Sequence, residues 1–516
     1  MRPIDYFDRG AAISGGAVFL EGAGKTFTFA ETRRLTQDIS NSLCASGLEQ
    51  GDSVAVFSPN DPQAVVCIQA VFRSGGAWIP VNVRNATSTN AQYMAYVDTR
   101  WLLFHSAVID AVEEIVPQLD GLKGVICMDS SETPYPSLED FCEKAPEGET
   151  PDWSDPFGAP DRVFARWPTG GTTGPSKGVE ISNRSICTMI ELGLRHYIGD
   201  QENDVVHLAV APITHAAGVV ISIYAAVGGK TVVVPEFNPK AVLEAIETHR
   251  VTHIFLPPTA YYALLDEAEN SDRDLSSLRQ LLLAAAPVSA DKLKAGVGRF
   301  GPVICQCYGQ AEAPMLVSWL GPEVVAAAVN GDHPERIRSC GRVTSPVQVA
   351  ILNEKGEQVE NGERGEICCR GPLVTPGYYK KPDATDEARK FGWHHTGDVG
   401  VLDEHGFLYI VDRLKDMIIT GGFNVFSAEV EGPILAISEV LECAVIGVPD
   451  EKWGEAIKAI VVLREGKSIS EDEILTRIRK DLGGVKTPKS LEIWPSIPKT
   501  NVGKTDKKAI REKFQD

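Results

Sequence analysis

The segment Arg166-Trp-Pro-Thr-Gly-Gly-Thr-Thr-Gly-Pro-Ser-Lys-Gly178 combines four glycines and three threonines with a single lysine. Glycine tolerates positive φ and lets backbone amides converge on an anion, and a lysine adds a mobile positive charge. The segment therefore predicts a loop that binds a polyphosphate. Taken alone, it leaves open a second interpretation, a flexible linker rich in glycine and threonine.

The common phosphate-loop patterns do not fit this segment. Lys177 follows Ser176 rather than a glycine, so the spacing G-x-x-x-x-G-K-[ST] is absent, and G-x-G-x-x-G is absent from the segment as well. A different nucleotide-binding family has to account for it.

Four later segments carry further glycines, acidic residues and lysines. They are Tyr308-Gly-Gln-Ala-Glu312, Trp393-His-His-Thr-Gly-Asp-Val-Gly400, Val411-Asp-Arg-Leu-Lys-Asp-Met-Ile-Ile-Thr-Gly-Gly-Phe-Asn424 and Pro498-Lys-Thr-Asn-Val-Gly-Lys-Thr505. In order and spacing, the five segments resemble the core motifs of the adenylate-forming superfamily. This superfamily contains acyl- and aryl-CoA synthetases, peptide-synthetase adenylation domains and beetle luciferases. The resemblance extends over nearly the whole chain, from Thr26-Phe-Thr-Phe-Ala-Glu31 to the C-terminal lysines.

Length and charge limit the classes of protein to consider. A chain of 516 residues is too long for one hydrophobic core and predicts two or three folding units. Its hydrophobic content of 43% is ordinary for a globular protein. The formal net charge of -20 argues against a nucleic-acid partner or an anionic membrane surface. An anionic ligand must therefore meet a local basic site.

The sequence gives no indication of membrane insertion or of disulfides. No basic and then apolar leader follows Met1, and the longest apolar run, near Val219 to Val227, is far shorter than the ~20 residues of a membrane helix. We therefore expect a cytoplasmic protein without integral membrane association. Among the eleven cysteines, the closest pairs, Cys305/Cys307 and Cys368/Cys369, lack C-x-x-C spacing. We interpret the cysteines as buried, reduced thiols and expect no zinc.

The pattern of apolar residues predicts an α/β fold. Ser53–Phe57 precedes a helical run from Gln63 to Phe72, and Thr231–Val234 precedes another from Pro239 to Arg250, which is the rhythm of parallel βαβ units. Beyond about residue 340, strands and turns predict hairpins of a small β-subdomain.

The C-terminal segment predicts a further α/β unit. Ser470-Glu-Asp-Glu473 is a capping box ahead of Ile474, Leu475, Ile478 and Leu482, which share one helical face. Together with the resemblance, this implies a large N-terminal domain at residues 1–411, made of two α/β subdomains and the β-subdomain. A hinge at 412–415 and a small mobile α+β C-terminal domain at 416–516 follow.

The resemblance implies a site for ATP and Mg2+. Joining a carboxylate to the α-phosphate of ATP requires phosphate donors, a divalent cation and a lysine for the developing charge. Thr169 and Glu312 are implied magnesium ligands, although Glu312 alone could be a solvated surface carboxylate. Ser is common in the family where this chain has Gly170, and Pro where it has Ser176, which suggests altered loop stiffness. The implied phosphate-binding residues are Thr169, Gly170, Gly171, Thr172, Thr173, Gly174 and Lys177.

The adenosine contacts are also implied by the resemblance. Ala284-Ala285-Ala286-Pro287 stands where the family usually has Gly-Gly-Ala-Pro, and with Cys307 and Tyr308 it should enclose adenine, beside Gly309, Gln310 and Ala311. Asp398 is the implied ribose ligand, because a carboxylate can accept hydrogen bonds from both hydroxyls. The alternative is a turn aspartate that caps a neighbouring amide. Arg413 should reach the ribose or a phosphate.

Two lysines and a glycine pair match the parts of the family that move. Lys415 matches the hinge, and Lys504 matches the lysine that contacts the carboxylate and α-phosphate during adenylation. Gly421, Gly422 and Phe423 would replace Lys504 in a second state and line the pantetheine tunnel. The alternative for both lysines is simple solvent exposure. Lys504 is also a candidate for control by a lysine acetyltransferase, because acetylation removes the charge.

A histidine marks the implied acyl pocket. His215, in Ala211-Pro-Ile-Thr-His-Ala-Ala-Gly218, matches the family histidine that borders the substrate, although a lone histidine is more often structural. Relatives that activate amino acids place an aspartate in this stretch, and this chain has none, so an α-amino acid is not expected. The implied pocket is uncharged and apolar. Its residues are Ala211, His215, Ala216, Ala217, Ala284, Cys307, Gly309 and Pro314.

These observations favour an ATP-dependent acyl- or aryl-CoA synthetase that uses Mg2+ and coenzyme A. We expect a monomer or homodimer acting on a hydrophobic aromatic, arylalkanoic or medium-chain acid. The alternatives are an adenylating enzyme that loads a carrier protein, luciferase-like oxygenation, and a catalytically silent nucleotide-binding protein. The presence of Lys177, Glu312, Asp398 and Lys504 argues against the silent protein.

Overall fold

The computed structural model describes residues 1–144, 158–169, 176–199, 204–500 and 505–514. By their internal contacts, these residues form two compact units. The first unit contains the described residues up to Gln348 together with Cys369–Gly392. The second contains Val349–Cys368 and the described residues from Trp393 onward.

One sheet of the first unit has the strand order β18-β8-β7-β4-β3-β5-β6. Strands β3 to β7 pair in parallel along it, whereas β8 and β18 are antiparallel. The helix α3 (Pro62–Ser74) follows β3, and Asp61 caps it by accepting from the Gln63 amide. The predicted strand–helix pair is therefore confirmed. The strands are β3 (Ser53–Phe57), β4 (Ala77–Val81), β5 (Thr99–Phe104), β6 (Gly124–Cys127), β7 (Val163–Pro168), β8 (Gly178–Ser182) and β18 (Gly377–Tyr378).

A second sheet of this unit runs in the order β2-β1-β10-β9-β11-β12-β13-β14-β15. From β1 to β13 the neighbouring strands are parallel, so the second βαβ prediction, with α9 (Pro239–His249) after β10, is also confirmed. The strands are β1 (Val18–Gly22), β2 (Lys25–Thr28), β9 (Val206–Ala209), β10 (Lys230–Val233), β11 (His253–Leu256), β12 (Gln280–Leu283), β13 (Ile304–Gln310), β14 (Ala313–Leu320) and β15 (Gly341–Val343).

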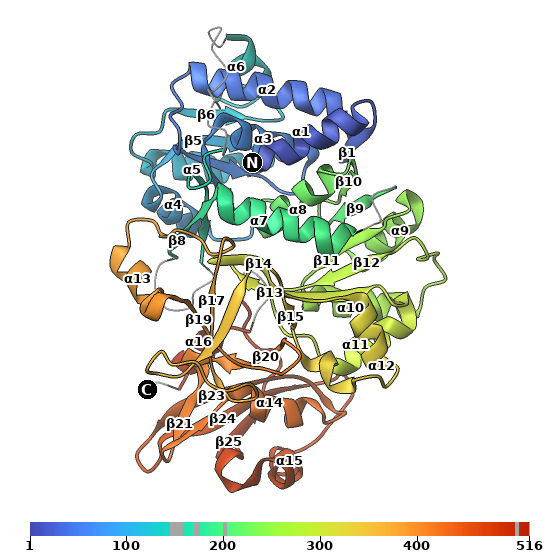
Figure 1. The fold of residues 1–516 in the computed structure, drawn as a ribbon, viewed down its shortest axis with the longest axis vertical. Helices are drawn as coiled ribbons and strands as arrows, with labels where there is room; N and C mark the ends of the chain where they lie inside the picture. The colour runs from blue at the N-terminus through green and yellow to red at the C-terminus, as the bar shows by residue number, and fades with distance from the viewer. Residues whose placement is uncertain (145–157, 170–175, 200–203, 501–504, 515–516) are drawn as a thin grey trace. The chain divides into compact units, whose positions relative to one another are not determined.

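Helices cover these sheets. Figure 1 shows α1, α2 and α3 lying together over the N-terminal strands. The helix α8 is apolar on all sides, so it is buried, as Val219, Val220 and Ile221 show. The remaining helices of this unit are α1 (Pro3–Ser14), α2 (Phe29–Ala45), α4 (Thr87–Tyr96), α5 (Ile109–Ile115), α6 (Leu138–Lys144), α7 (Asn183–Gly193), α8 (Ala216–Ala225), α10 (Pro258–Glu269), α11 (Ala290–Phe300), α12 (Pro322–Val329) and α13 (Pro382–Glu387).

The second unit begins with four strands in the order β16-β17-β19-β20. They are β16 (Gln348–Leu352), β17 (Gly365–Arg370), β19 (His394–Leu402) and β20 (Phe407–Arg413). One of the hairpins predicted beyond residue 340 is formed by β19 and β20, which are antiparallel, and at its turn the Asp403 carboxylate accepts from the amides of His405 and Phe407.

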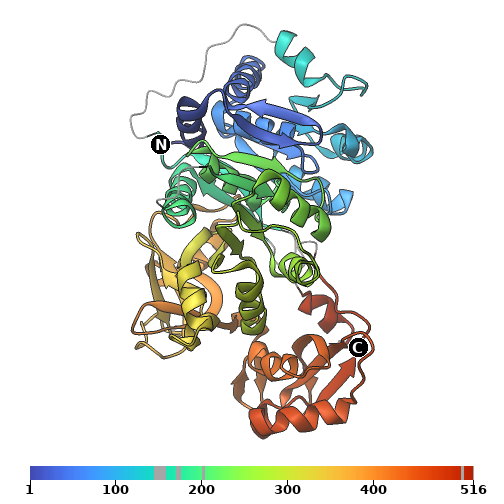
Figure 2. The same ribbon diagram turned by 90° about the vertical axis from the view of Figure 1, so that its right-hand side faces the viewer.

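The other sheet of the second unit has the order β22-β21-β24-β23, with β25 beside β24. One face packs against α14 and α15, and the other against α16, as Figure 2 shows in orange to red. The elements are β21 (Ile418–Thr420), β22 (Phe423–Val425), β23 (Val440–Asp450), β24 (Gly454–Leu463), β25 (Ser490–Ile493), α14 (Ser427–Leu435), α15 (Glu471–Lys486) and α16 (Lys507–Glu512).

The predicted start of α15 is confirmed, but its capping contacts differ in part. The Ser470 hydroxyl accepts from the Glu473 amide at 3.3 Å. The Glu473 carboxylate accepts from Arg477, one turn further on, at 3.1 Å. Ile474 and Ile478 are buried against the sheet, with Leu475 and Leu482 beside them. The same helical face is therefore buried as the sequence predicts.

The α/β fold class is confirmed, with a large N-terminal part that contains two largely parallel sheets and a smaller C-terminal part of sheets and helices. The boundaries 1–411, 412–415 and 416–516 stay predictions, as does the motion of the C-terminal domain. Within the described residues, no helix has both the length and the apolar character needed to span a membrane. All eleven cysteines are free thiols.

Candidate active site

The ends of the predicted phosphate loop close a hairpin. β7 and β8 are antiparallel, with Pro168 opposite Gly178. The Thr169 amide donates to the Lys177 carbonyl at 3.0 Å, and the Lys177 amide donates to the Thr169 hydroxyl at 3.1 Å. The side chain of Lys177 is exposed. The predicted phosphate-binding residues between these ends lie outside the described residues; they are Gly170, Gly171, Thr172, Thr173 and Gly174.

A buried arginine fixes the base of this hairpin. The guanidinium of Arg166 donates to the Ser53 hydroxyl at 2.7 Å and lies 4.3 Å from the centre of the Tyr379 ring. Tyr93 in turn donates to the Arg166 carbonyl at 3.1 Å. Because the charge is held by hydrogen bonds and a ring face, β7 enters the loop along a fixed path.

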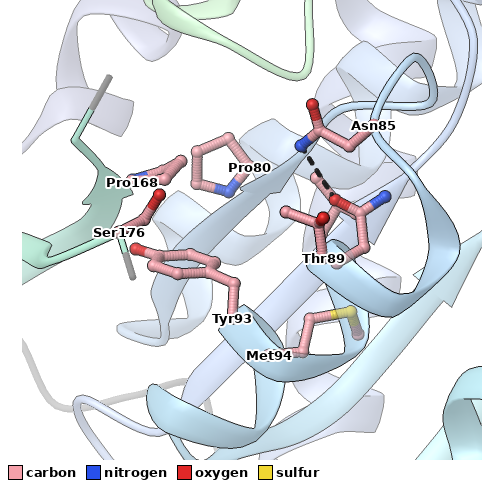
Figure 3. A pocket seen from close by; sticks show the side chains of 9 residues that line it. Pro80, Asn85, Thr89, Tyr93, Met94, Pro168 and Ser176 are labelled. Carbon is pink, nitrogen blue, oxygen red and sulfur yellow. Dashed lines mark hydrogen bonds between the residues drawn. The ribbon is translucent and has the colours of Figure 1, made fainter. Parts of the chain in front are cut away.

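A small cavity lies beside the hairpin base. Figure 3 shows Tyr93, Pro168 and Ser176 on one side of it, and Asn85 and Thr89 on the other. Asn85 donates to the Asn90 side chain at 3.0 Å. Its volume is about 30 Å³, close to the volume that one molecule occupies in liquid water. The space is too small for a nucleotide.

Glu312 lies at the tip of a β-hairpin. Gln310 pairs with Ala313 at the end of β13 and β14, which leaves Ala311 and Glu312 as the two turn residues. Gly309 lies against the backbone of the opposite strand, where a Cβ atom would be 2.5 Å from the Met315 nitrogen. The glycine is therefore required by a close approach of two backbones.

Tyr378 contacts both Glu312, the implied magnesium ligand, and Lys177 of the predicted phosphate loop. Tyr378 donates its hydroxyl to Glu312 Oε1 at 2.8 Å, and Lys177 Nζ lies 4.7 Å from the centre of the same ring. Burial, and then the charge of Glu312, raise the pKa of Tyr378, so the tyrosine remains a hydrogen-bond donor. Glu312 and Lys177, far apart in the sequence, are thus brought to opposite parts of one side chain.

The implied adenine-binding motifs lie at the carboxyl ends of two neighbouring strands of the second sheet. Ala284–Pro287 follow the carboxyl end of β12, next to Cys307 and Tyr308 on β13. Ala285 has φ of 76° where the family usually has glycine. Cys307 is buried, which raises the pKa of its thiol to about 12, and Tyr197 donates to its sulfur. The carboxyl ends of parallel strands are the usual ligand-binding edge of such sheets.

The His215 loop leaves the same edge after β9. The side chain of Asn60 donates to the carbonyls of Val210 and Ala211, and its oxygen accepts from the Ile213 amide at 2.9 Å. His215 is the residue before α8 and is half-buried. Of the other implied pocket residues, Ala217 and Pro314 are buried, Ala211, Ala284 and Gly309 are half-buried, and the side chain of Ala216 is not described.

The second unit holds the implied ribose and hinge residues. Asp398 on β19 is buried and pairs with Arg413 on β20, whose Nε lies 2.6 Å from Asp398 Oδ1. Lys415 is exposed in the turn Leu414–Asp416 that follows β20. Lys504 lies outside the described residues.

The implied CoA-tunnel residues form the turn between β21 and β22. Gly421 and Gly422 both have positive φ, and Phe423 is 57% exposed. The Gly421 amide donates to the Trp453 carbonyl at 2.8 Å. A Cβ atom on Gly421 would be 2.7 Å from the Trp453 ring, so this turn also requires glycine.

Three residues that support the site did not emerge from the sequence. Asn60 follows β3 in Ser58-Pro-Asn-Asp61, and polar residues directly after a buried strand could have indicated it. Arg166 begins the quoted loop but carries no motif signal. Tyr378 lies far from both residues that it joins, so only the fold reveals its role.

A larger hollow, of about 350 Å³, lies at the opposite end of β12 from Ala284. No predicted site residue in the described part of the chain lines it. Its lining residues are Arg195, His196, Ile198, Gly199, Gln280, Trp319, Pro322 and Glu323.

Two known family models match this chain. The family model of the AMP-binding enzyme matches residues 7–379, and that of the AMP-binding enzyme C-terminal domain matches residues 429–504. Feruloyl-CoA synthase of Amycolatopsis sp is 34% identical over 514 residues, which are 98% of this chain and 98% of that protein. The medium/long-chain-fatty-acid–CoA ligase FadD8 of Mycobacterium tuberculosis (strain ATCC 25618 / H37Rv) is 42% identical over 363 residues, which are 69% of this chain and 62% of that relative.

Solved structures share the whole fold. ATP-bound MatB from Rhodopseudomonas palustris has a TM-score of 0.87 and 27% identity, and the match covers 100% of this chain and 99% of that one. The amide bond synthetase McbA from Marinactinospora thermotolerans has a TM-score of 0.87 and 29% identity, over 99% and 100% of the two chains. This chain therefore belongs to the AMP-binding enzymes, the adenylate-forming superfamily that its motifs predicted, and within them to the AMP-forming acid–thiol ligases, which use ATP, Mg2+ and coenzyme A.

Proposed function

We propose that this enzyme activates a hydrophobic aromatic, arylalkanoic or medium-chain carboxylic acid and transfers its acyl group to coenzyme A. In the first step, a carboxylate oxygen attacks the α-phosphorus of ATP, and pyrophosphate leaves to give acyl-AMP. In the second, the CoA thiolate attacks the acyl carbon, and AMP leaves as the thioester forms. AMP replaces hydroxide as the leaving group, which makes the second step feasible.

The observation that carries this proposal is the convergence of Lys177 and Glu312 on Tyr378. A lysine for the phosphates and a carboxylate for the metal are the two charges that adenylation requires. Glu312 accepts from Tyr378 at 2.8 Å, and Lys177 Nζ lies 4.7 Å from the ring of the same tyrosine. A catalytically silent nucleotide-binding protein would not need to hold these two charged groups on one tyrosine.

Thr169 and Glu312 are our proposed magnesium ligands. Both offer oxygen, the ligand atom that Mg2+ prefers, and Glu312 lies half-buried at a hairpin tip with Tyr378 fixing one of its oxygens. The ion neutralises charge on the phosphate oxygens when it is bound. Asp398 is the proposed ribose ligand, and its pairing with Arg413 holds one of its oxygens in place.

The acid specificity is proposed from the loop that Asn60 supports. The side chains offered by this edge, Ala211, Ala217 and Ala284, are small and uncharged, with His215 as the polar group. The relatives named above act on ferulic acid and on medium- and long-chain fatty acids, as their names state. Both kinds of acid are hydrophobic, which agrees with an uncharged pocket.

We further propose that Lys504 acts in the first step only, and that Gly421–Phe423 take its place for the second after rotation near Lys415. Lys504→Ala should then slow acyl-AMP formation by about 10²–10³, the usual value of one electrostatic donor. Thioester formation from synthetic acyl-AMP should continue. Equal losses in both half-reactions would contradict this division.

The reaction class is tested with a panel of acids, ATP and Mg2+, following pyrophosphate release and product formation. We offer three acceptors in parallel: CoA, a holo-carrier protein and a primary amine, the last because an amide bond synthetase shares the fold. We expect thioester formation with CoA and hydrophobic acids. Pyrophosphate release without CoA transfer would favour the other acceptors, and no release with any acid would favour a silent protein.

The cellular setting completes the proposal. We place the enzyme in the cytoplasm as a monomer or homodimer, and we propose that acetylation of Lys504 lowers its activity by removing the charge that the first step uses. Mass spectrometry of enzyme from cells with lowered activity should find the modified lysine. An unmodified Lys504 in such cells would exclude this form of control.

A further inference from the structure

Three different metal-ligating side chains converge on one sheet face in the second unit. Glu366 and Cys368 are two positions apart on β17, so they point to the same side, and His395 lies on the neighbouring strand β19. His395 Nδ1 is 2.7 Å from Glu366 Oε2 and 3.5 Å from Cys368 Sγ. Within the described residues, this is the one such group found, and its ligand atoms lie within 4.8 Å of one another.

From this geometry we infer a binding site for a soft divalent cation of the zinc class, separate from the magnesium of the adenylation reaction. A thiolate and an imidazole are the ligands that distinguish such ions from Mg2+, and a carboxylate completes a three-ligand set with water in the fourth position. A tetrahedral ion with ordinary bonds to sulfur, nitrogen and oxygen separates its ligands by roughly 3.3–3.6 Å. The Cys368–His395 distance already has this value.

The distance between Glu366 and His395 is shorter than a bound ion would allow, and the difference is small. At 2.7 Å, Glu366 and His395 share a hydrogen bond. An ion that replaces the shared proton needs these atoms to separate by less than about 1 Å. Glu366 is the anchor in this exchange, because its other oxygen accepts from the Gly397 amide at 2.9 Å. Such an outer contact orients a ligating carboxylate.

The surroundings of the cluster suit a thiolate–metal bond. Cys368 is fully buried beside Ala350 and Leu352, and Trp393 packs against this small cluster. The side chains of Glu366 and His395 are 18% and 15% exposed, so they lie between the buried sulfur and the solvent. An apolar floor excludes water from the sulfur, while the two partly exposed ligands leave an entry path for the ion.

Binding releases one proton. The Cys368 thiol gives its proton to the solvent as the sulfur electron pair forms the metal bond. His395 binds through the lone pair of Nδ1, and its single proton moves to Nε2.

The test uses the full chain, stripped of metals with a chelator and titrated with Co2+. Thiolate ligation gives a cobalt charge-transfer band in the near ultraviolet, and Zn2+ should displace it with a stoichiometry of one ion per chain. Cys368→Ala should abolish the band and weaken Zn2+ binding by at least about 100-fold, since even an outer partner is worth 10- to 100-fold. The matched control is Cys369→Ala, an equally buried cysteine on the opposite face of the same strand.

A second variant keeps the test independent of folding. Glu366→Gln retains an acceptor for Gly397 but removes the anionic ligand, and we expect at least about 10-fold weaker Zn2+ binding with an unchanged circular dichroism spectrum. No charge-transfer band in the wild-type chain would overturn the inference and leave a hydrogen-bonded cluster. A band that persists in Cys368→Ala would also overturn it.

Discussion

At the scale of single residues, the site depends on the absence of a side chain at Gly309. Gly309 has no side chain because the backbone of Met315 occupies the space, with only 2.5 Å to a Cβ atom. The glycine in the Tyr308-Gly309 motif therefore sets the distance between β13 and β14, and with it the position of Glu312 at their tip.

Gly309→Ala should lower both stability and adenylation. Overpacking of this kind typically costs 1–3 kcal/mol, and the strands can separate only by displacing the hairpin tip. We expect a lower urea midpoint and slower pyrophosphate release. Gly298→Ala is the control, because it lies in α11 with nothing within 4 Å of a new Cβ atom. That change should raise the free energy of unfolding by up to about 1 kcal/mol, and a similar decrease in both variants would contradict our account of Gly309.

Glu312 and Tyr378 should be separable by conservative changes. Glu312→Gln keeps an oxygen for Tyr378 but removes the charge, so acyl-AMP formation should fall by about 10²–10³. Tyr378→Phe leaves the carboxylate and removes one hydrogen bond, with an expected loss of about 10-fold. Calorimetric titration with Mg-ATP and single-turnover pyrophosphate release measure both. Unaltered Mg-ATP binding and normal turnover in Glu312→Gln would exclude the metal role.

At the scale of elements, the second sheet of the first unit encloses buried histidines. His207 on β9 is stacked on Tyr224 of α8, with ring centres 4.3 Å apart. His253 on β11 donates from Nε2 to the Tyr197 carbonyl and accepts at Nδ1 from the Thr252 hydroxyl. Burial lowers the pKa of His207 to about 3 and that of His253 to about 4. Both rings are therefore neutral in the folded protein at neutral pH.

The sheet should be sensitive to acid for this reason. In the unfolded chain these histidines take up protons near pH 6.5, whereas the folded state resists protonation down to about pH 3 to 4. Their contribution is complete above pH 6.5 and is lost as the pH falls, at about 1.4 kcal/mol per pH unit for each histidine. His207→Gln should make the free energy of unfolding less steep between pH 6.5 and 4.5, as measured with urea. The exposed His405→Gln should leave the slope unchanged, and equal slopes for wild type and His207→Gln would refute the assignment.

At the scale of the whole molecule, the turn at Lys415 joins β20 to the C-terminal sheet. The turn is short, Leu414–Asp416: Leu414 and Lys415 are exposed, whereas Asp416 is half-buried and pairs with Arg511 at 2.9 Å. A hinge is a small number of such residues between two separately packed cores.

Lys415→Pro should separate the two half-reactions. Proline fixes φ near about -65°, so a turn that must adopt two conformations would keep one. We expect near-normal acyl-AMP formation and a strong loss of thioester formation from preformed acyl-AMP. Lys415→Ala, which keeps the dihedral freedom, should retain both. Wild-type thioester formation in a folded Lys415→Pro enzyme would mean that the hinge lies elsewhere.

Whether a feature can be predicted from the sequence depends on how far apart in the chain its residues lie. The runs Ser53–Phe57 and Gln63–Phe72 predict β3 and α3 because their periodicity is local. Motif spacing predicts which residues serve the nucleotide. The contacts of Tyr378 were not predictable, since they join segments that only the folded sheet brings together. The same holds for Cys368 and His395, which lie 27 positions apart, beyond any ligand spacing that cysteine patterns encode.

Asn60 has an evolutionary consequence. It holds the start of the His215 loop through the carbonyls of Val210, Ala211 and Val234 and the amide of Ile213. All of these are main-chain groups. Every amino acid supplies the carbonyls, and every amino acid except proline supplies the amide. Selection can therefore exchange the side chains of this loop for a new acid while its path over the sheet is inherited unchanged. A library that randomises the loop and keeps Asn60 should yield folded enzymes with altered acid specificity. The same library built on Asn60→Ala should yield few folded enzymes.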